Sequence, residues 1–208
     1  TLLVNGQPVP ADTGKTVEQG TTYVALAAMA QTLDPSVTIT WDGGSSTAAV
    51  QSAVLDLTAK VGQQYLVANG RYLYVPEGVR MEAGRVVVPL KELVKGFDAK
   101  LNFFNDKATT EIYTGSGGIA SGDSFYNQDD LFWLSRVVYA ESGNQSLDGK
   151  IAVANVVLNR VKSPIFPNTI EGVLAQKNQF TTYRGGDLAN RTPNASSVIA
   201  AKLVMDGG

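Results

Sequence analysis

Hydrophobic and polar residues alternate with a period of two in the first half of the chain and recur with a helical period in the second half. Before residue 114, β-branched runs such as 47–50 and 109–113 lie between glycine-containing turns, which predicts strands. After it, Leu131, Leu134 and Val138 recur at i, i+3 and i+7, which predicts an amphipathic helix. We therefore expect an α+β chain with two domains, the second of them mainly helical.

An internal repeat with an offset of 64 residues organises the first half. Asn5-Gly6 returns as Asn69-Gly70, and a Val-x-Leu-x-x-Met/Leu run predicted as a short helix occurs at 24–29 and again at 88–93. Each copy reads as strand, turn, strand, short helix, strand, turn, strand. One copy alone buries too little apolar surface, so we expect two copies to share one core over residues 1–114.

Two details of this organisation are less regular. Near the end of each copy an aromatic residue precedes an Asp-containing turn, and the sequence pairs Trp41 with Phe104, one residue off the offset of the repeat. Residues 115–124 are mostly glycine, serine and alanine, a composition typical of flexible linkers. We therefore expect a mobile linker there, followed by a helical domain over residues 125–208.

Capping residues mark where the helices of the second domain should begin. Asn127 precedes the helix that contains Leu131, and Ser146 precedes an apolar run that should form the next helix. The segment 167–169 introduces a third, short helix, and Pro193 opens a final helix that ends near residue 205. These signals predict four helices with short connections.

Composition removes several classes of function. The 208 residues carry a net charge of −2 and include neither His nor Cys, and no apolar run is long enough to span a bilayer. The charge gives no electrostatic reason for binding nucleic acid. Without His or Cys, Ser-His and Cys-His catalysis is excluded and the commonest metal ligands are missing. We therefore expect no metal and no cofactor, and any chemistry must use carboxyls, hydroxyls, amides, Lys or Arg.

Glu141 is the residue that such chemistry would use. It follows Val138 on the apolar stripe, and Ser142-Gly143-Asn144 reads as a helix stop, so the carboxyl should lie on the inward face of the last turn. Burial and the negative end of the helix dipole would both raise its pKa, as a general acid for glycosidic cleavage requires. The alternative is a frayed helix end with Glu141 turned to solvent, and the pattern alone leaves both interpretations open.

The repeated Asn-Gly, Gly-x-x-Tyr/Val-Val-Pro/Ala-Leu and aromatic-Asp pattern resembles the copper amine oxidase-like N-terminal stalk domain over residues 1–114. Domains of this family are commonly appended to secreted bacterial surface enzymes. The resemblance implies a wall-binding or spacing module, while a passive scaffold is an equally good interpretation. It does not imply copper, because the chain lacks His and Cys.

The remainder resembles the bacterial cell wall hydrolase family that includes the spore-cortex lytic enzymes. Four blocks carry the resemblance: 134–141, 149–161, 163–173 and 179–180. It implies a lysozyme-like or lytic-transglycosylase-like helical domain that cleaves peptidoglycan glycan strands, with Glu141 as catalytic acid. Members usually continue beyond the position of Gly208, so this domain is expected to be truncated at its C-terminus.

A sugar-binding groove is expected around the catalytic acid. Aromatic and amide side chains suit it, because rings stack on pyranose faces and amides bond to N-acetyl groups. The candidates are Tyr139, Gln179, Phe180, Tyr183 and Asn155. For Phe180 a place in the core is an equally good explanation. Asn155 would either line the cleft or hold neighbouring loops.

The carboxyls of the second domain predict the type of reaction. Besides Glu141, its only glutamate is Glu171, which should sit in a first helical turn and complement the dipole there. Asp148 and Asp187 are possible second carboxyls, one at a helix start and one in a loop. Ordinary glycosidases use two carboxyls, whereas a lytic transglycosylase can work with one, because the C6 hydroxyl of muramic acid is the nucleophile.

We therefore expect cleavage between N-acetylmuramic acid and N-acetylglucosamine by a lytic transglycosylase. The expected partner is peptidoglycan, and the expected location is outside the cell, at the wall or spore cortex, as a monomer. Two alternatives stay open: a conventional muramidase or glucosaminidase, and a cell-wall binding protein without catalytic activity.

Overall fold

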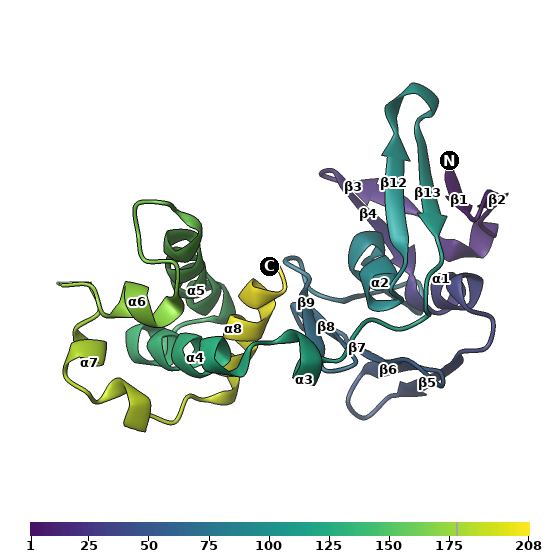
Figure 1. Cartoon of the computed structure of the whole chain (residues 1–208). Coiled ribbons are helices and arrows are strands. Elements are labelled where there is room, and N and C mark those ends of the chain that lie inside the picture. Colours follow the sequence, from purple (N-terminus) through teal and green to yellow (C-terminus); the bar gives the residue numbers. More distant parts are fainter. Residues whose placement is uncertain (178) are drawn as a thin grey trace. The chain divides into compact units, whose positions relative to one another are not determined.

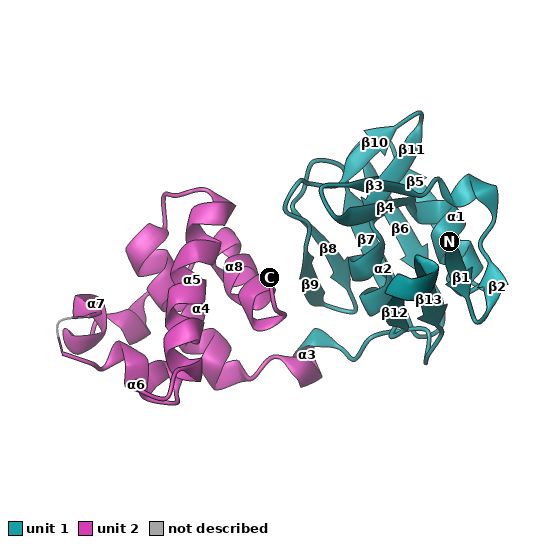
Figure 2. Ribbon diagram, turned by 90° about the horizontal axis from the view of Figure 1, so that it is seen from above, with its two compact units in different colours: residues 1–122 teal, residues 123–208 magenta. Residues whose placement is uncertain are grey.

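Strands make up most of the chain before residue 114, and helices make up most of the chain after it (Figure 1). The structure is a computed structural model that describes residues 1–177 and 179–208. It divides into two units, Thr1–Gly122 and Asp123–Gly208, which we call unit 1 and unit 2 (Figure 2). The predicted α+β class with a helical second domain is confirmed.

Unit 1 contains the same series of elements twice. Each copy has a hairpin, a second hairpin, a short helix and a third hairpin. The first copy comprises β1 (Leu2–Val4), β2 (Gln7–Pro8), η1 (Ala11–Thr13), β3 (Thr16–Glu18), β4 (Thr21–Ala25), α1 (Leu26–Leu33), β5 (Thr38–Asp42) and β6 (Thr47–Gln51). The second comprises β8 (Tyr65–Ala68), β9 (Arg71–Tyr74), β10 (Arg80–Glu82), β11 (Arg85–Pro89), α2 (Leu90–Gly96), β12 (Lys100–Phe104), η2 (Asn105–Lys107) and β13 (Thr109–Tyr113). One strand, β7 (Asp56–Lys60), lies between the copies.

The Asn-Gly pairs form equivalent turns in the two copies. Asn5 and Gly6 have φ angles of 48° and 80°, and Asn69 and Gly70 have φ angles of 51° and 77°. Positive φ at both central residues is the geometry of the tight hairpin turn that Asn-Gly favours. The offset of 64 residues therefore describes local backbone structure as well as sequence.

The two copies are related by a pseudo-two-fold axis that passes through one pair of residues. In the sheet β10-β11-β4-β3, the antiparallel strands β4 and β11 place Val24 opposite Val88, and these two positions are equivalent in the repeat. The outer hairpins then exchange between copies: β12-β13 joins β1-β2 in one sheet, and β5-β6 joins β8-β9 through β7 in the other. Strand β1 pairs with β13 in parallel.

One core serves both copies. Leu26 and Met29 of α1 are buried together with their counterparts Leu90 and Leu93 of α2, each at most 1% exposed. At roughly 1.5–3 kcal/mol for each fully buried large aliphatic side chain, this shared core is the main stabilising contribution that neither copy could make alone.

The register of the third hairpins corrects one pairing made from the sequence. Trp41 lies opposite Ala48 across β5 and β6, and Phe103 lies opposite Thr110 across β12 and β13. Trp41 is therefore equivalent to Phe103, and the pairing with Phe104 is wrong. The chain between the helix and the third hairpin is two residues shorter in the second copy, which changes the offset from 64 to 62.

Residues 115–122 are not a mobile linker, and that prediction is wrong. Ile119 is buried and its N–H donates to the Gly96 carbonyl at 3.0 Å. A Cβ atom added to Gly115 would lie 2.0 Å from the Asp98 carbonyl oxygen, and one added to Gly118 would lie equally close to a backbone oxygen. These glycines are needed where two backbones approach closely, so their frequency reflects packing rather than flexibility.

Unit 2 is built from helices. They are α3 (Gly122–Phe125, which begins at the end of unit 1), α4 (Gln128–Ser142), α5 (Leu147–Lys162), α6 (Ile170–Leu174), α7 (Thr181–Arg184), η3 (Leu188–Asn190) and α8 (Ala195–Met205). The side chains of Asn127, Ser146, Thr169 and Asn194 each accept a backbone N–H at the start of a helix, as N-caps do. Helix α8 packs against both α4 and α5. No helix in the described part of the chain is long and apolar enough to cross a membrane.

Candidate active site

Helix α4 carries the predicted catalytic residue in its last turn. Its buried side chains are Leu134, Ser135, Val137, Val138 and Ser142. On a helix of 3.6 residues per turn, position 141 lies about 20° from position 134 around the axis, inside the arc that these residues bury. Glu141 thus has the angular position of a core residue, as the apolar stripe predicted.

Glu141 is nevertheless exposed, so the predicted burial is wrong. The inward face of α4 is covered along its middle turns, but its last turn opens onto a pocket. The deepest position there belongs to Ser142, which is 3% exposed and whose hydroxyl donates to the Val138 carbonyl at 2.7 Å. Burial therefore does not act on the Glu141 carboxyl in this structure. Its place in the last turn is as predicted.

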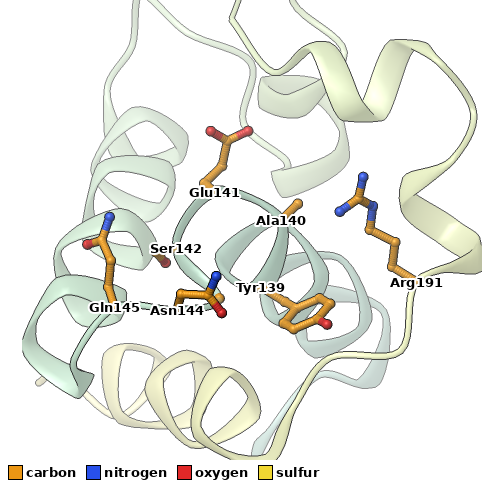
Figure 3. Close-up of a pocket in the computed structure, with 8 residues that line it drawn as sticks. Tyr139, Ala140, Glu141, Ser142, Asn144, Gln145 and Arg191 are labelled. Carbon is orange, nitrogen blue, oxygen red and sulfur yellow. The ribbon is translucent and has the colours of Figure 1, made fainter.

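The pocket around Glu141 has a volume of about 370 Å³. Most of its lining is the end of α4 and the turn after it, and the complete set is Tyr139, Ala140, Glu141, Ser142, Gly143, Asn144, Gln145 and Arg191. In Figure 3 the Glu141 carboxylate stands clear of the other labelled side chains. An exposed carboxylate surrounded by amides, a phenol and a guanidinium can exchange a proton with a bound polar molecule.

The turn after α4 is tightly packed. A Cβ atom at Gly143 would lie 2.6 Å from the Tyr139 carbonyl oxygen and 3.1 Å from the Tyr139 ring, so glycine is required where this ring crosses the helix end. The Lys150 ammonium, on a side chain only 2% exposed, donates to the Gln145 carbonyl at 2.6 Å. These contacts set the position of the pocket wall relative to Glu141.

Arg191 was not among the residues singled out from the sequence. Its Nε and Nη2 both donate to Oδ2 of Asp187, at 3.3 and 3.2 Å, which leaves Nη1 outside this ion pair. In Figure 3 the guanidinium and the Glu141 carboxylate extend from separate sides of the pocket. Arg191 enters the pocket from a loop fifty residues further along the chain, and no local pattern around it indicates that placement.

Three predicted substrate-binding residues lie outside the pocket lining. Phe180 is only 7% exposed and is a core residue, which corrects its predicted role in the groove. Gln179 accepts a hydrogen bond from Nη1 of Arg160 at 2.7 Å, so its amide oxygen is occupied. The Arg160 guanidinium also lies 5.6 Å from the Phe180 ring centre. These residues form a structural cluster around Arg160.

Tyr183 belongs to a neighbouring group of side chains. Its hydroxyl donates to Glu171 at 2.8 Å, and its ring meets Trp133 of α4 edge to face with centres 5.4 Å apart. The hydrogen bond to Glu171 raises the pKa of Tyr183. Asn155 is half-buried on α5 and does not line the pocket. Of the five predicted binding residues, only Tyr139 shares the pocket with Glu141.

Glu141 is the one carboxyl among the residues that line this pocket. Glu171 and Asp187 are engaged with Tyr183 and Arg191, and Asp148 is exposed in the first turn of α5. Within residues 1–177 and 179–208 there is no group of three His, Cys, Asp or Glu that could hold a metal ion. The site therefore offers proton transfer by a single carboxyl, assisted by amide, phenol and guanidinium donors.

The molecule is thus a two-domain α+β protein whose helical domain presents one carboxylate in an open pocket. Residues 3–112 match the copper amine oxidase N-terminal domain family, and residues 144–208 match the Cell Wall Hydrolase family. The chain therefore belongs to the copper amine oxidase N-terminal domain family through unit 1 and carries a Cell Wall Hydrolase domain in unit 2. Copper does not fit the residues present, because His and Cys are absent.

Several relatives bear names that refer to the spore cortex. A spore cortex-lytic enzyme of Bacillus cereus is 36% identical over 112 residues, which are 49% of this chain and 42% of that protein. Its Bacillus subtilis counterpart is 35% identical over 82 residues, which are 39% of this chain and 27% of that protein. The chain thus spans less than half the length of these relatives.

Solved structures are also similar to part of the chain. The catalytic domain of the germination-specific lytic transglycosylase SleB from Bacillus anthracis is 37% identical, with 43% of this chain and 70% of that chain covered and a TM-score of 0.36. The corresponding domain of the Bacillus cereus SleB protein is also 37% identical, with 40% and 64% covered and a TM-score of 0.37.

Proposed function

We propose that unit 2 cleaves the glycan strands of peptidoglycan between N-acetylmuramic acid and N-acetylglucosamine, as a lytic transglycosylase, with Glu141 as the only proton carrier. The observation that carries the proposal is the lone carboxyl in the pocket at the end of α4. The Cell Wall Hydrolase match and the cortex-lytic names of the relatives support the substrate class.

The reaction follows from what one carboxyl can do. Glu141 donates its proton to the bridging oxygen, and the bond between that oxygen and C1 of the muramic residue breaks. The resulting carboxylate takes the proton of the C6 hydroxyl, whose oxygen bonds to C1 and closes a 1,6-anhydro ring. Atoms and charge balance without water, and Glu141 returns to its protonated form.

Exposure of Glu141 is compatible with this role. A bound sugar would exclude water from the carboxyl, and exclusion of water disfavours the charged form of an acid. The neighbouring amides of Asn144 and Gln145 can bond to N-acetyl groups, and Nη1 of Arg191 can donate to a carbonyl oxygen on the muramic side arm. The substrate would thus complete the environment that the free pocket lacks.

A hydrolytic mechanism is the second candidate, because the proposed enzyme class of unit 2 includes it. An inverting or retaining glycosidase needs a second carboxyl near the first. Asp148 and Asp187 are the nearest carboxyls along the chain, but neither lines the pocket. In this structure Asp187 also pairs with Arg191.

Mass analysis of the products separates these mechanisms. Purified peptidoglycan digested by the full chain should give muropeptides that end in 1,6-anhydromuramic acid, each lighter by one water than a hydrolytic product and resistant to borohydride reduction. Reducible ends would overturn transglycosylation, and Asp148→Asn and Asp187→Asn would then identify the second carboxyl. Absence of any cleavage by a folded chain that still binds the strands would instead support a non-catalytic binding protein. If active, the enzyme would act at the wall or spore cortex.

A further inference from the structure

Unit 1 contains two pockets that the internal repeat makes equivalent. The first, about 310 Å³, lies between β5, the start of α1 and the β10-β11 hairpin, and the second, about 1350 Å³, lies between β12, the start of α2 and the β3-β4 hairpin. Each of these element sets is the repeat counterpart of the other. We call them the first and second repeat pockets (the elements are labelled in Figures 1 and 2).

The correspondence extends to individual positions. Ala25 and Leu26 line the first pocket, and their counterparts at an offset of 64, Pro89 and Leu90, line the second. Ile39 and Leu101, 62 residues apart, correspond in the same way. Chance placement of two surface hollows would not reproduce such pairs on three different elements. The pseudo-two-fold axis at Val24 and Val88 therefore generates two versions of one site.

Each pocket has an exposed aromatic ring and an exposed aliphatic side chain in its lining. Trp41 and Met81 of the first are 47% and 42% exposed, and their counterparts Phe103 and Val17 of the second are 59% and 60% exposed. Large apolar side chains exposed together at a concave surface indicate a binding site when the same arrangement recurs. Here it occurs on both sides of the axis.

The polar groups of the pockets are few and partly different. The first contains Thr40 and Arg85, and the second contains, among others, Thr22 and Lys91. A flat ring beside hydroxyl and cationic donors suits a pyranose, which has an apolar C–H face and an edge of hydroxyls. Because the two sites carry similar aromatics, the fitting ligand is one that presents the same unit repeatedly.

We infer that the two repeat pockets bind sugar rings of one glycan strand, so that unit 1 is a bivalent polysaccharide-binding module. A strand of repeating disaccharides can occupy both pockets of one molecule, which raises the affinity well above that of either site because the second contact is intramolecular. This role goes beyond cleavage by unit 2 and requires neither Glu141 nor any of the residues around it.

The test measures binding of the full chain to insoluble glycan strands from which the stem peptides have been removed. All variants carry Glu141→Gln, so that no strand is cut during the assay. Trp41→Ala and Phe103→Ala should each weaken binding about 10-fold, and the double variant about 100-fold, as expected when two linked sites are lost. Because both side chains are exposed, unfolding of unit 1 should be unchanged.

Phe104→Ala is the matched control. Phe104 is 37% exposed, follows Phe103 on β12 and does not line the second pocket, because successive side chains of a strand point to opposite faces. It should bind within twofold of the parent. Ala27→Gln offers an independent variant of the first pocket, since it adds bulk at an exposed position in the first turn of α1 without removing any side chain. It should match Trp41→Ala.

Three results would overturn the inference. Binding of the double variant equal to that of the parent would remove both pockets from glycan recognition. Losses seen only with strands that retain stem peptides would assign the pockets to a peptide ligand. A parent dimer in sedimentation that dissociates in the Trp41 or Phe103 variants would assign them to a second copy of the chain. None of these results depends on whether unit 2 cleaves glycan.

Discussion

Unit 1 contains its main features twice, whereas unit 2 contains its main feature once. In unit 1 the repeat duplicates the Asn-Gly turns, the short helices and the pockets beside Trp41 and Phe103. In unit 2, the single pocket described around a helix end holds one carboxyl, Glu141. Duplication suits repeated contact with a polymer, because each copy adds affinity. A reaction needs only one well-placed group, so the units should respond differently to mutation.

The largest effect is expected from the residue that has no duplicate. Glu141→Gln keeps the size of the side chain but cannot deliver a proton, so cleavage of peptidoglycan should fall about 1,000- to 10,000-fold, the upper part of the range for general acid–base catalysis. Thermal unfolding should stay unchanged because the side chain is exposed. The other glutamate of unit 2 is the control: Glu171→Gln should retain activity within a few fold. A fully active Glu141→Gln enzyme would remove the basis of the proposed mechanism.

The Asn-Gly turns test whether duplicated positions are also equal in energy. Asn69 accepts a hydrogen bond from Asp56 and donates to the carbonyls of Val54 and Ile119, whereas Asn5 exchanges hydrogen bonds with Thr114 alone. At about 1 kcal/mol for each bond, Asn69→Ala should destabilise unit 1 by about 2–3 kcal/mol and Asn5→Ala by about 1–2 kcal/mol. Hydrogen exchange in β8 and β1 measures both. Equal losses would show that the contact with Ile119 contributes nothing.

Gly143 links the stability of unit 2 to its chemistry. In Gly143→Ala the new methyl group must displace the Tyr139 carbonyl and ring, which lie 2.6 and 3.1 Å from it. Overpacking of this kind should cost about 1–3 kcal/mol and should also lower activity, because the wall beside Glu141 moves. Gly185→Ala is the control, since its nearest neighbour would be 3.8 Å away. Unchanged melting temperature and turnover in Gly143→Ala would show that this turn adapts freely.

Arg191 should affect binding more than turnover. Arg191→Met keeps much of the side-chain length but loses the guanidinium, so KM for glycan strands should rise about 10-fold with kcat nearly unchanged, as expected for one charged hydrogen bond. Asp187→Asn, which leaves Arg191 in place, should raise KM less. A fall in kcat at constant KM would instead place Arg191 in the chemical step.

The smallest effect concerns Glu92 of unit 1, and it depends on pH. Burial raises the pKa of Glu92 above its ordinary value of 4.5, so folding disfavours the ionised form of this carboxyl. The cost is absent below that ordinary value and is fully present above the raised one. Glu92→Gln should therefore raise the melting temperature of unit 1 slightly at pH 7 and leave it unchanged near pH 4. Equal shifts at both pH values would mean that packing, not charge, is responsible.

The residues that could be interpreted correctly from the sequence alone are those whose roles are local. The Asn5 and Asn69 turns, the N-caps at Asn127 and Ser146 and the end of a helix beside Glu141 all depend on a few neighbouring residues. Periodicity also separated the two units, because strands and helices bury side chains with different periods.

The neighbours of these elements became known only from the folded structure. Glu141 has the helical angle of a core residue but is exposed, because the last turn of α4 opens onto a pocket. Gly115 and Gly118 look like linker residues but allow close backbone contact. Arg191 reaches the pocket from a distant loop, and the repeat pockets form where elements from both copies meet. Long-range packing sets each of these placements, and local sequence does not encode it.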